Sequence, residues 1–402
     1  MAFGGGAAAE PLTANQQLAH DIYKELTEID TTTATGDTKR AAEAMAARLK
    51  AAGFPDEDVH VFSPAPRKGN LVALLHGSGK RKPILLLAHL DVVPALREDW
   101  SVDPFKLTEQ DGYFYARGSS DDKYMAASFV TNLIRYRQEG YKPDRDIIVA
   151  LETDEEILDR DAVGIQWLLR NHRDLIDAEF ALNEGGGVGL KDGKPIRNSV
   201  QTTEKVSLGY QLEVRDPGGH SSVPRKDNAI YRLAEGLAKL SKFSFPVRLN
   251  DTTRAYFERT AQSMSEATAA DMRAALAEKP DPSSFERLSS IPFFNAQLRT
   301  TCVATMLQGG HAVNALPQLA TAKVNCRIMP GEPVTEVKAT LERVLDDDKI
   351  VVTQVGEPVL SAPSALNEEI IGAIDKLTQE FWPGAIVLPV MSTFLHCPRC
   401  SL

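Results

Sequence analysis

Apolar residues along the first half of the chain follow two patterns, unbroken runs and helical spacing. The unbroken runs are rich in Leu, Ile and Val and predict strands over residues 69–77, 82–93, 145–156 and 178–187. Helical spacing predicts two helices within residues 14–52, separated by TTTATGDT, and further helices over 121–140 and 164–175. Asp111-Gly112 lies between two alternating segments and predicts a β-hairpin. Strands that alternate with helices are typical of an α/β domain.

The pattern changes after about Lys205. Residues 205–215 alternate as a half-exposed antiparallel strand does. The same block contains further expected strands and amphipathic helices at residues 302–310, 320–331, 228–240 and 334–345, with a polar helical insertion at 250–290. A helix at 367–382 and a strand at 385–392 resume the first pattern. We therefore expect an α/β domain in two parts, residues 1–204 and 358–402, interrupted by an α+β domain of residues 205–357.

Composition narrows the class of protein. At 402 residues the chain is long enough for two domains. It has 43% hydrophobic and 25% charged residues, which is typical of a globular protein. The formal net charge of -10 argues against binding to nucleic acid, because phosphate backbones require clustered Lys and Arg. No apolar run is long enough to cross a bilayer, so no membrane partner is expected.

The four cysteines and the N-terminus bear on the compartment. Cys302, Cys326, Cys397 and Cys400 are too few for a disulfide framework in a chain of this length. The CPRC pair lacks a second pair, so we interpret it as a chance spacing. Near the N-terminus, AAAE resembles the end of a signal peptide, although a basic segment and an apolar segment are lacking. We favour an exported or periplasmic protein, with a cytoplasmic protein as the alternative.

Ionisable residues gather where the predicted strands end, in HLD, TDEE and NEGGG. Ligands of α/β sheets bind beyond the carboxyl ends of the strands. The candidates are His89, Asp91, Asp121, Asp122, Asp154, Glu155, Glu156 and Glu184. So many carboxylates would repel one another unless a cation lay among them. One imidazole among carboxylates suits Zn²⁺, with Mn²⁺ or Co²⁺ as substitutes, and a bridging carboxylate suggests two metals roughly 3.5–4 Å apart.

In this interpretation His89 is a metal ligand, and Asp91 holds its other ring nitrogen. Each motif alone has a simpler explanation. An HxD pair often occurs by chance, DEE is usually a solvated turn, and NEGGG could be only a glycine-rich loop. Their joint occurrence in this order, each after a predicted strand, favours the metal site.

The chain resembles the co-catalytic zinc exopeptidases and deacylases, which include aminoacylase, carboxypeptidase S, glutamate carboxypeptidase and succinyl-diaminopimelate desuccinylase. The matching motifs are AHLDVVP, ARGSSDDK, TDEE, NEGGG, GGHSSVP, GGHAVNALP and CRIMPGE. They follow the family order to about residue 391, and they most resemble the carboxypeptidase S and aminoacylase branch. The resemblance implies a mixed-sheet α/β catalytic domain with an inserted α+β lid and dimerisation domain.

The resemblance also implies roles for the acidic residues. His89 and Glu184 would bind one zinc ion, Asp121 would bridge two, and Glu156 would bind the second. The bond between Asp121 and Asp122 would be a cis peptide. Glu155 would be the general base that takes a proton from water and passes it to the leaving amine.

Three further roles fall in the inserted domain. By resemblance, His220 would reach the partner subunit's site and stabilise the developing oxyanion. Asn314 would contact substrate, and Arg327 would bind a substrate carboxylate through its planar guanidinium group. From the residues alone, simpler explanations are favoured: a capped turn for His220, a turn residue for Asn314 and a surface salt bridge for Arg327. The resemblance favours the functional roles and a homodimer formed through the lid.

The chain departs from the family pattern at its C-terminus. The family's last metal ligand is a histidine that follows a glycine-rich segment, whereas VLPVMST here continues into FLHCPRCSL. This change indicates a truncation or a shifted reading frame. His396 is the only histidine of this tail, and nothing around it favours a role as replacement ligand. The second metal would then keep only Asp121 and Glu156, which predicts a weak site.

These observations favour a dimeric zinc hydrolase that cleaves an amide bond next to a free carboxylate. Its substrate would be an N-acyl amino acid or a short peptide. A dipeptidase or aminopeptidase-like activity on the same scaffold is one alternative. An inactive remnant that only folds or dimerises through the lid is the other.

Overall fold

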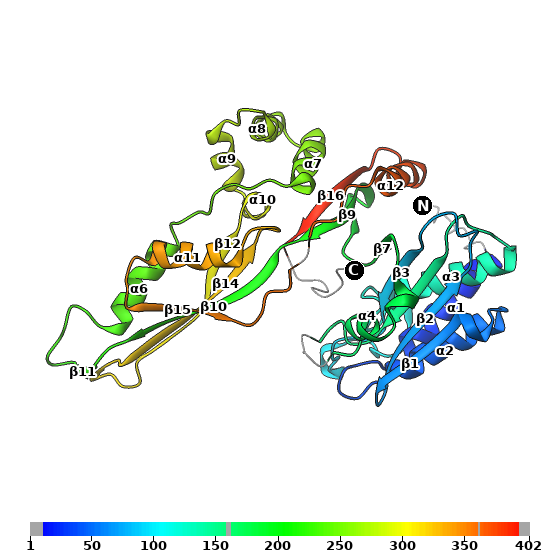
Figure 1. Cartoon of the computed structure of the whole chain (residues 1–402), viewed down its shortest axis with the longest axis horizontal. Helices are drawn as coiled ribbons and strands as arrows, with labels where there is room; N and C mark the ends of the chain where they lie inside the picture. The colour runs from blue at the N-terminus through cyan, green and yellow to red at the C-terminus, as the bar shows by residue number, and fades with distance from the viewer. Residues whose placement is uncertain (1–10, 158–161, 361, 394–402) are drawn as a thin grey trace, which may run out of the picture. The chain divides into compact units, whose positions relative to one another are not determined.

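The computed structural model describes residues 11–157, 162–360 and 362–393 (Figure 1). The chain divides into two compact units, of which the first ends at Glu184 and the second begins at Gly185. Each unit has its own hydrophobic core. The three-part domain division expected from the sequence stays a prediction. The mixed α/β architecture with an antiparallel block confirms the expected fold class.

The first unit is built on a five-stranded mixed sheet with the order β1-β2-β6-β3-β7. The strands are β1 (Val59–Ala65), β2 (Lys68–Leu75), β3 (Ile84–His89), β6 (Ile147–Glu152) and β7 (Phe180–Leu182). β3 is parallel to β6 and β7, whereas β1, β2 and β6 pair antiparallel. The helices are α1 (Ala14–Glu28), α2 (Thr38–Ala51), α3 (Lys123–Glu139), α4 (Ile165–Asn171) and α5 (Arg173–Ile176). Helices α1, α2 and α3 pack on one face of this sheet, and α4 lies on the other side (Figure 1).

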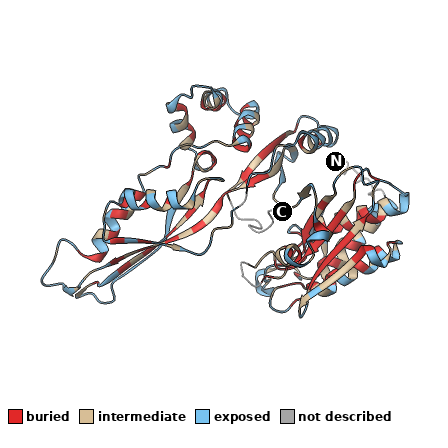
Figure 2. Cartoon of the chain, viewed as in Figure 1, coloured by how far each residue is buried: buried red, intermediate tan, exposed pale blue. Residues whose placement is uncertain are grey.

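Burial explains why the central strands are so apolar. β3 and β6 lie inside the sheet with helices on both faces, so most of their residues are buried (Figure 2). Each strand becomes polar only at its last residue. His89 ends β3 and is paired in register with Glu152, which ends β6. The predicted gathering of ionisable groups at the carboxyl ends of the strands is therefore confirmed here.

The predicted hairpin is formed by β4 (Thr108–Gln110) and β5 (Tyr113–Tyr115), which make a separate two-stranded sheet. Its two turn residues both have positive φ, 54° at Asp111 and 80° at Gly112. This conformation suits Asp-Gly and explains why the dipeptide predicted the turn. Short 3₁₀ turns lie directly before β1, at η1 (Asp56–Asp58), and before β4, at η2 (Arg97–Asp99).

The second unit contains a four-stranded antiparallel sheet with the order β12-β14-β10-β15. Its strands are β10 (Val206–Arg215), β12 (Thr301–Gly309), β14 (Leu319–Ile328) and β15 (Ile350–Val355). Alternate residues of β10 and β14 are buried beneath α6 (Ala229–Leu240) and α11 (Val334–Leu345), as the alternating pattern predicted. A small ribbon of β11 (Gly219–His220) and β13 (Ala315–Leu316) extends one end of this sheet (Figure 1).

The rest of the second unit is a three-stranded sheet and a group of helices. The sheet consists of β8 (Gly187–Lys191), β9 (Lys194–Glu204) and β16 (Ile386–Ser392), and α12 (Glu368–Phe381) packs against β16. The predicted helical insertion contains α7 (Asp251–Thr260), η3 (Ala261–Ser263), α8 (Glu266–Leu276), α9 (Pro282–Ser289) and α10 (Pro292–Leu298). Among the described residues, no helix has both the length and the apolar character of a membrane span.

A disulfide joins the edge strand β12 to its neighbour β14. Cys302 and Cys326 are directly opposed in the strand register, with their Cα atoms 4.1 Å apart. The sequence analysis did not identify this pair, because the two cysteines are 24 residues apart and meet only through the strand register. Cys397 and Cys400 lie outside the described residues.

Lys205 is a fully buried lysine between β9 and β10. Its Nζ donates a hydrogen bond to the main-chain oxygen of Arg299 at 2.6 Å. Burial lowers the pKa of Lys205 to about 7, although the charge of Glu332 opposes this effect and Arg327 adds to it. An uncharged lysine can be buried more cheaply than an ammonium group.

Replacing Cys302 with Ser should lower the free energy of unfolding by about 3 kcal/mol, because the unfolded chain is no longer constrained by the loop that the disulfide closes. Denaturant unfolding of oxidised wild type and variant would measure the loss. Treatment with reductant should abolish the difference between the two proteins. A variant as stable as the oxidised wild type would contradict the prediction.

Replacing Lys205 with Met should change the pH dependence of stability. The pKa of Lys205 is lower in the folded chain than in the unfolded chain, so the unfolded state binds more protons between about pH 7 and 10. Wild-type stability should therefore gain up to about 1.4 kcal/mol per pH unit from this residue across that window. The Met variant lacks the gain, so its stability relative to wild type should fall as pH rises. A relative stability that is independent of pH would argue against the burial of a titrating lysine.

Candidate metal centre

Three ligand atoms meet at the carboxyl end of the five-stranded sheet. They belong to His89 at the end of β3, Asp121 before α3, and Glu184 after β7, and all lie within 4.8 Å of one another. His89 Nε2 lies 2.8 Å from Asp121 Oδ1 and 3.9 Å from Glu184 Oε2. One imidazole nitrogen and two carboxylate oxygens form a donor set that fits Zn²⁺ and other divalent metals.

The ring of His89 is held in one orientation. The imidazole is buried, and its Nδ1 lies 3.0 Å from the main-chain oxygen of Asp91. A proton on Nδ1 satisfies that carbonyl and leaves Nε2 to face Asp121 and Glu184, as a metal ligand requires. The carboxylate of Asp91 is slightly farther from Nδ1, at 3.6 Å.

The buried carboxylate of Asp91 also positions the TDEE segment. It accepts hydrogen bonds from the main-chain N–H groups of Glu155 and Glu156, both at 3.1 Å. These bonds connect Asp91, in the loop after β3, to the TDEE segment, which follows β6. Asp91 therefore places Glu155 and Glu156 next to His89, a role that goes beyond the expected contact with the ring.

The electrostatics of the site favour a cation. The pKa of Glu155 is raised to about 7, mainly by burial and also by the negative charges of Glu184, Asp91 and Glu156, against the opposing effect of His89. Burial, followed by the charge of Asp121, also raises the pKa of Glu156. Both shifts indicate carboxyl groups that lack enough positive charge around them.

His89 responds to the same negative charge in the opposite direction. Burial alone would lower its pKa, but hydrogen bonds with Asp121 and Asp91 and the charge of Glu184 raise it well above the usual value. The proton thus retained by His89 lies where a divalent cation would be bound. The peptide bond from Asp121 to Asp122 is cis, as the resemblance implied.

The second expected metal position is less complete. Asp121 and Glu156 both line one cavity of the first unit, and the negative charge of Asp121 raises the pKa of Glu156. Glu156 is not part of the three-ligand group. His396 lies outside the described residues, so the structure bears only on the ligands that precede it.

Asp154, the first acid of TDEE, is used differently. Its carboxylate pairs with Lys68 Nζ at 2.5 Å and accepts a hydrogen bond from the Thr153 hydroxyl. Asp154 has a positive φ of 66°, a conformation in which Asp is tolerated better than most residues. This residue shapes the turn that presents Glu155 and Glu156.

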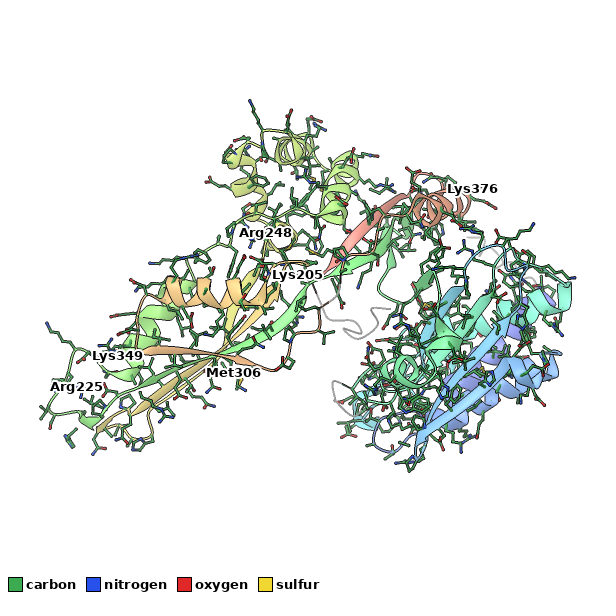
Figure 3. All side chains as sticks on the ribbon, viewed as in Figure 1. Lys205, Arg225, Arg248, Met306, Lys349 and Lys376 are labelled. Carbon is green, nitrogen blue, oxygen red and sulfur yellow. A yellow bond between two sulfur atoms is a disulfide. The ribbon has the colours of Figure 1, made fainter. Side chains whose placement is uncertain are left out.

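The residues expected to contact substrate in the second unit occupy two places. His220 and Asn314 are together and exposed near the β11–β13 ribbon, where Ser221 N–H donates to the Asn314 main-chain oxygen at 2.9 Å. Arg327 is near the other end of β14, opposite Ser207 and Thr301. About 25 Å of strand separates the two places, at roughly 3.3 Å per residue. Figure 3 labels Arg225, near the ribbon, and Lys205, just before β10, toward opposite ends of this strand.

Two features of the first unit were missed from the sequence. Lys123 is buried at the start of α3, where its Nζ donates to the Ile29 main-chain oxygen at 2.8 Å and burial lowers its pKa to about 7. An aromatic cavity also lies beside the acids, with Trp100 and Phe114 in its walls. The spacing of these aromatic residues along the chain gave no sign that they meet.

Curated relatives are similar to this chain in sequence. The chain is 30% identical over 319 residues to a probable carboxypeptidase S-like protein of Dictyostelium discoideum, covering 77% of this chain and 60% of that protein. It is 32% identical over 295 residues to the human N-fatty-acyl-amino acid synthase/hydrolase PM20D1, covering 70% of this chain and 57% of that protein. The chain thus spans about 60% of the length of these relatives.

Solved structures show the same fold. An M20 family metallo-carboxypeptidase from Sulfolobus solfataricus has a TM-score of 0.64 at 17% identity, covering 95% of this chain and 87% of that chain. The Bacillus subtilis YXEP protein, described as a dinuclear metal binding peptidase, has a TM-score of 0.59 at 12% identity, covering 95% and 84%. Residues 85–396 match the model of peptidase family M20/M25/M40. Because that match includes most of the chain and contains the metal centre, the chain belongs to peptidase family M20/M25/M40.

Proposed function

We propose that this protein is a zinc-dependent hydrolase that cleaves the amide bond of an N-acyl amino acid. The observation that carries the proposal is the group formed by His89, Asp121 and Glu184, with Glu155 placed beside it through Asp91. One curated relative is named a probable carboxypeptidase S-like protein and the other an N-fatty-acyl-amino acid synthase/hydrolase, and cleavage next to a free carboxylate would be common to a carboxypeptidase and a hydrolase of acyl-amino acids. His89, Asp121 and Glu184 would hold one metal ion, and Asp121 and Glu156 would hold the second.

The proton transfers are assigned to Glu155. A bound metal ion would polarise the scissile carbonyl and acidify the attacking water. Glu155 would take the proton from that water and deliver it to the amide nitrogen as the C–N bond breaks, which gives a carboxylic acid and a free amine. Its pKa of about 7 in the metal-free chain supports this role, because burial keeps the group out of bulk water.

Arg327 is proposed to bind the carboxylate of the substrate. Its guanidinium group is partly buried, and burial lowers its pKa despite the charge of Glu204. Within the described part of the chain, its buried Nη1 atom has no hydrogen-bond partner. A planar guanidinium group with an unused N–H is suited to a carboxylate ligand.

A homodimer through the four-stranded sheet is proposed as the working form. β12 is an edge strand of that sheet, and its exposed side chains include the apolar Val303, Met306 and Leu307 (Figure 3 labels Met306). Ile230 of α6 continues this surface beside Gly309. Exposed apolar edges of sheets are suited to pairing with another chain. Pairing would also let His220, which is distant from Arg327 along β14, serve the partner subunit.

An oxidising compartment outside the cytoplasm is proposed as its location. The support is the disulfide between Cys302 and Cys326, since such bonds persist in secreted and periplasmic proteins and are rare in the cytosol. The zinc assignment, in place of another divalent metal, is proposed from the mixture of one imidazole and several carboxylates.

The reaction is tested by comparing N-acetyl amino acids with free dipeptides. We expect hydrolysis of the N-acyl amino acids by protein loaded with zinc, and loss of at least about tenfold in kcat/KM when the substrate carboxylate is amidated. A preference for free dipeptides would favour the dipeptidase alternative. No turnover of either class would favour the inactive remnant.

Glu155→Gln should lower kcat by at least about a hundredfold, since the variant cannot accept a proton. The amide side chain keeps the size of the original, so zinc content should stay at the wild-type level. Steady-state kinetics and elemental analysis measure the two quantities. Glu98→Gln changes another acid of the same unit and provides the control. Near-normal activity of Glu155→Gln would show that another group is the base.

Zinc binding should release protons, and more of them near pH 6.5 than near pH 8.5. Burial and neighbouring charge raise the pKa of Glu155 to about 7 and also raise that of Glu156, so Glu155 holds a proton on part of the molecules near neutral pH, and a cation displaces it. Zinc affinity should accordingly increase with pH. Calorimetric titration in two buffers of different ionisation enthalpy counts the protons.

We expect about one tightly bound zinc per chain, because the second position has fewer ligands. His89→Ala should remove it, whereas His76→Ala, which changes a largely exposed histidine of the same unit, should not. Two tightly bound zinc ions would indicate a further ligand, from the tail or from a second chain.

A further inference from the structure

We propose that Lys123 is a positioning residue of the metal centre, which holds the loop carrying Asp121 in place through a buried hydrogen bond. Lys123 is the first residue of α3 and directly follows Asp121 and Asp122. Its side chain is fully buried, and the proposed reaction gives it no role. This inference rests on the proposed function, because it concerns the affinity of the metal site that the function requires.

The buried side chain joins two segments that are far apart in the sequence. The Nζ atom of Lys123 donates a hydrogen bond to the main-chain oxygen of Ile29 at 2.8 Å, just after α1 ends. The main-chain N–H of Lys123 donates to the main-chain oxygen of Gly118 at 3.1 Å. The backbone of Lys123 thus closes the loop of residues 116–122, which joins β5 to α3, and its side chain anchors that loop to the end of α1. An amino group can donate this hydrogen bond whether or not it is protonated.

The packing of the 116–122 loop leaves the lysine little freedom. Gly118 has a positive φ of 81°, and a methyl group on it would lie only 3.0 Å from Cδ of Lys123. On the other side of Asp121, the hydroxyl of Tyr23 in α1 donates to the main-chain oxygen of Ser119 at 2.9 Å. The loop is therefore tied to α1 at two points, and Asp121 lies between them in the chain.

The segment that accepts the lysine's hydrogen bond also supports a second part of the metal centre. Residues 29–37 join α1 to α2, and the main-chain oxygen of Thr31 accepts a hydrogen bond from the N–H of Val92 at 3.3 Å. Thr32 and Val92 also form an isolated parallel bridge. Val92 directly follows Asp91, whose carboxylate positions the TDEE segment. The same short segment thus contacts the lysine after Asp121 and the residue after Asp91.

The two residues before Lys123 both contact His89. The buried carboxylate of Asp122 accepts a hydrogen bond from the main chain of His89. The Oδ1 atom of Asp121 lies 2.8 Å from Nε2 of the same histidine. A displacement of the first turn of α3 would therefore move two acids relative to the imidazole. Groups that orient metal ligands in this way typically change metal affinity by about 10-fold to 100-fold when they are replaced.

Charge and position predict opposite effects of replacing this lysine. The negative charges that act on Lys123 are those of Asp30 and Asp91. Any positive charge on the amino group would repel a zinc ion bound nearby, so loss of that charge alone would strengthen zinc binding. Loss of the hydrogen bond that fixes the 116–122 loop would weaken zinc binding instead. The sign of the change in affinity therefore distinguishes a positioning residue from a charge that merely lies nearby.

The test is the zinc affinity of the full chain with Lys123→Met, measured by competition with a chromophoric chelator at one fixed pH. We expect the Kd for zinc to rise at least about tenfold. Lys205→Met is the matched control, because it also removes a fully buried lysine that donates to a main-chain oxygen. Its zinc affinity should stay at the wild-type value. A purely structural role of a buried lysine would not distinguish the two variants.

Hydrogen exchange of the metal-free protein measures the positioning directly. In Lys123→Met we expect faster exchange than in wild type at the main-chain amides of residues 116–126, with β14 unchanged. Lys123→Gln is a second variant, whose side chain is shorter and uncharged. It should also weaken zinc binding, at least about threefold, and it decides the test if Lys123→Met does not fold. Circular dichroism verifies the fold of each variant.

The outcomes separate this inference from the proposed reaction. A folded Lys123 variant that binds zinc as tightly as wild type, or more tightly, would overturn the inference and leave the proposed function standing. An equal loss of affinity in Lys205→Met would also overturn it. Weaker zinc binding in the Lys123 variants alone, without turnover of any N-acyl amino acid by wild type, would support the inference and reject the proposed reaction. A wild-type chain that binds no zinc would overturn both.

Discussion

Repulsion among carboxylates at one edge of a sheet is the constraint around which the first unit is organised. The parallel strands β3, β6 and β7 deliver His89, the TDEE segment and Glu184 to the same edge. Burial beside one another makes these acids hold protons or require a cation. Asp91 satisfies two of the main-chain N–H groups that fix this arrangement. The site is therefore assembled by the backbone, and the cation relieves charge that the fold has already concentrated.

Much of this site could be predicted from the sequence because its signals are local. A buried strand that ends in a polar residue predicts both the strand and the edge where that residue lies, as with His89. The Asp111-Gly112 turn was predicted because its positive φ angles select those residue types. Alternation along β10 likewise predicted a strand with one buried face, which the structure confirms.

Other features depend on contacts between distant parts of the chain, and no local pattern encodes them. Cys302 meets Cys326 only because of the register between β12 and β14. Lysine is a residue type usually found at the protein surface, yet Lys205 is buried in the interior where β9 meets β10. Asp91 and His89 lie together, as expected. The carboxylate of Asp91 also accepts hydrogen bonds from the main chain of the TDEE segment, which the sequence did not predict. The strands β1, β8, β9 and β15 and helix α10 were also missed. Their segments are short or only weakly periodic.

The independence of the β4–β5 hairpin has a consequence for how such enzymes diversify. The hairpin forms its own two-stranded sheet and shares no strand pairing with the five-stranded sheet that carries His89. Insertions, deletions and aromatic replacements at its tip would leave the registers of β3, β6 and β7 intact. Natural selection could thus remodel the hairpin while the metal-binding framework stays constant. Directed evolution of this chain would accordingly find its most tolerant positions in that hairpin.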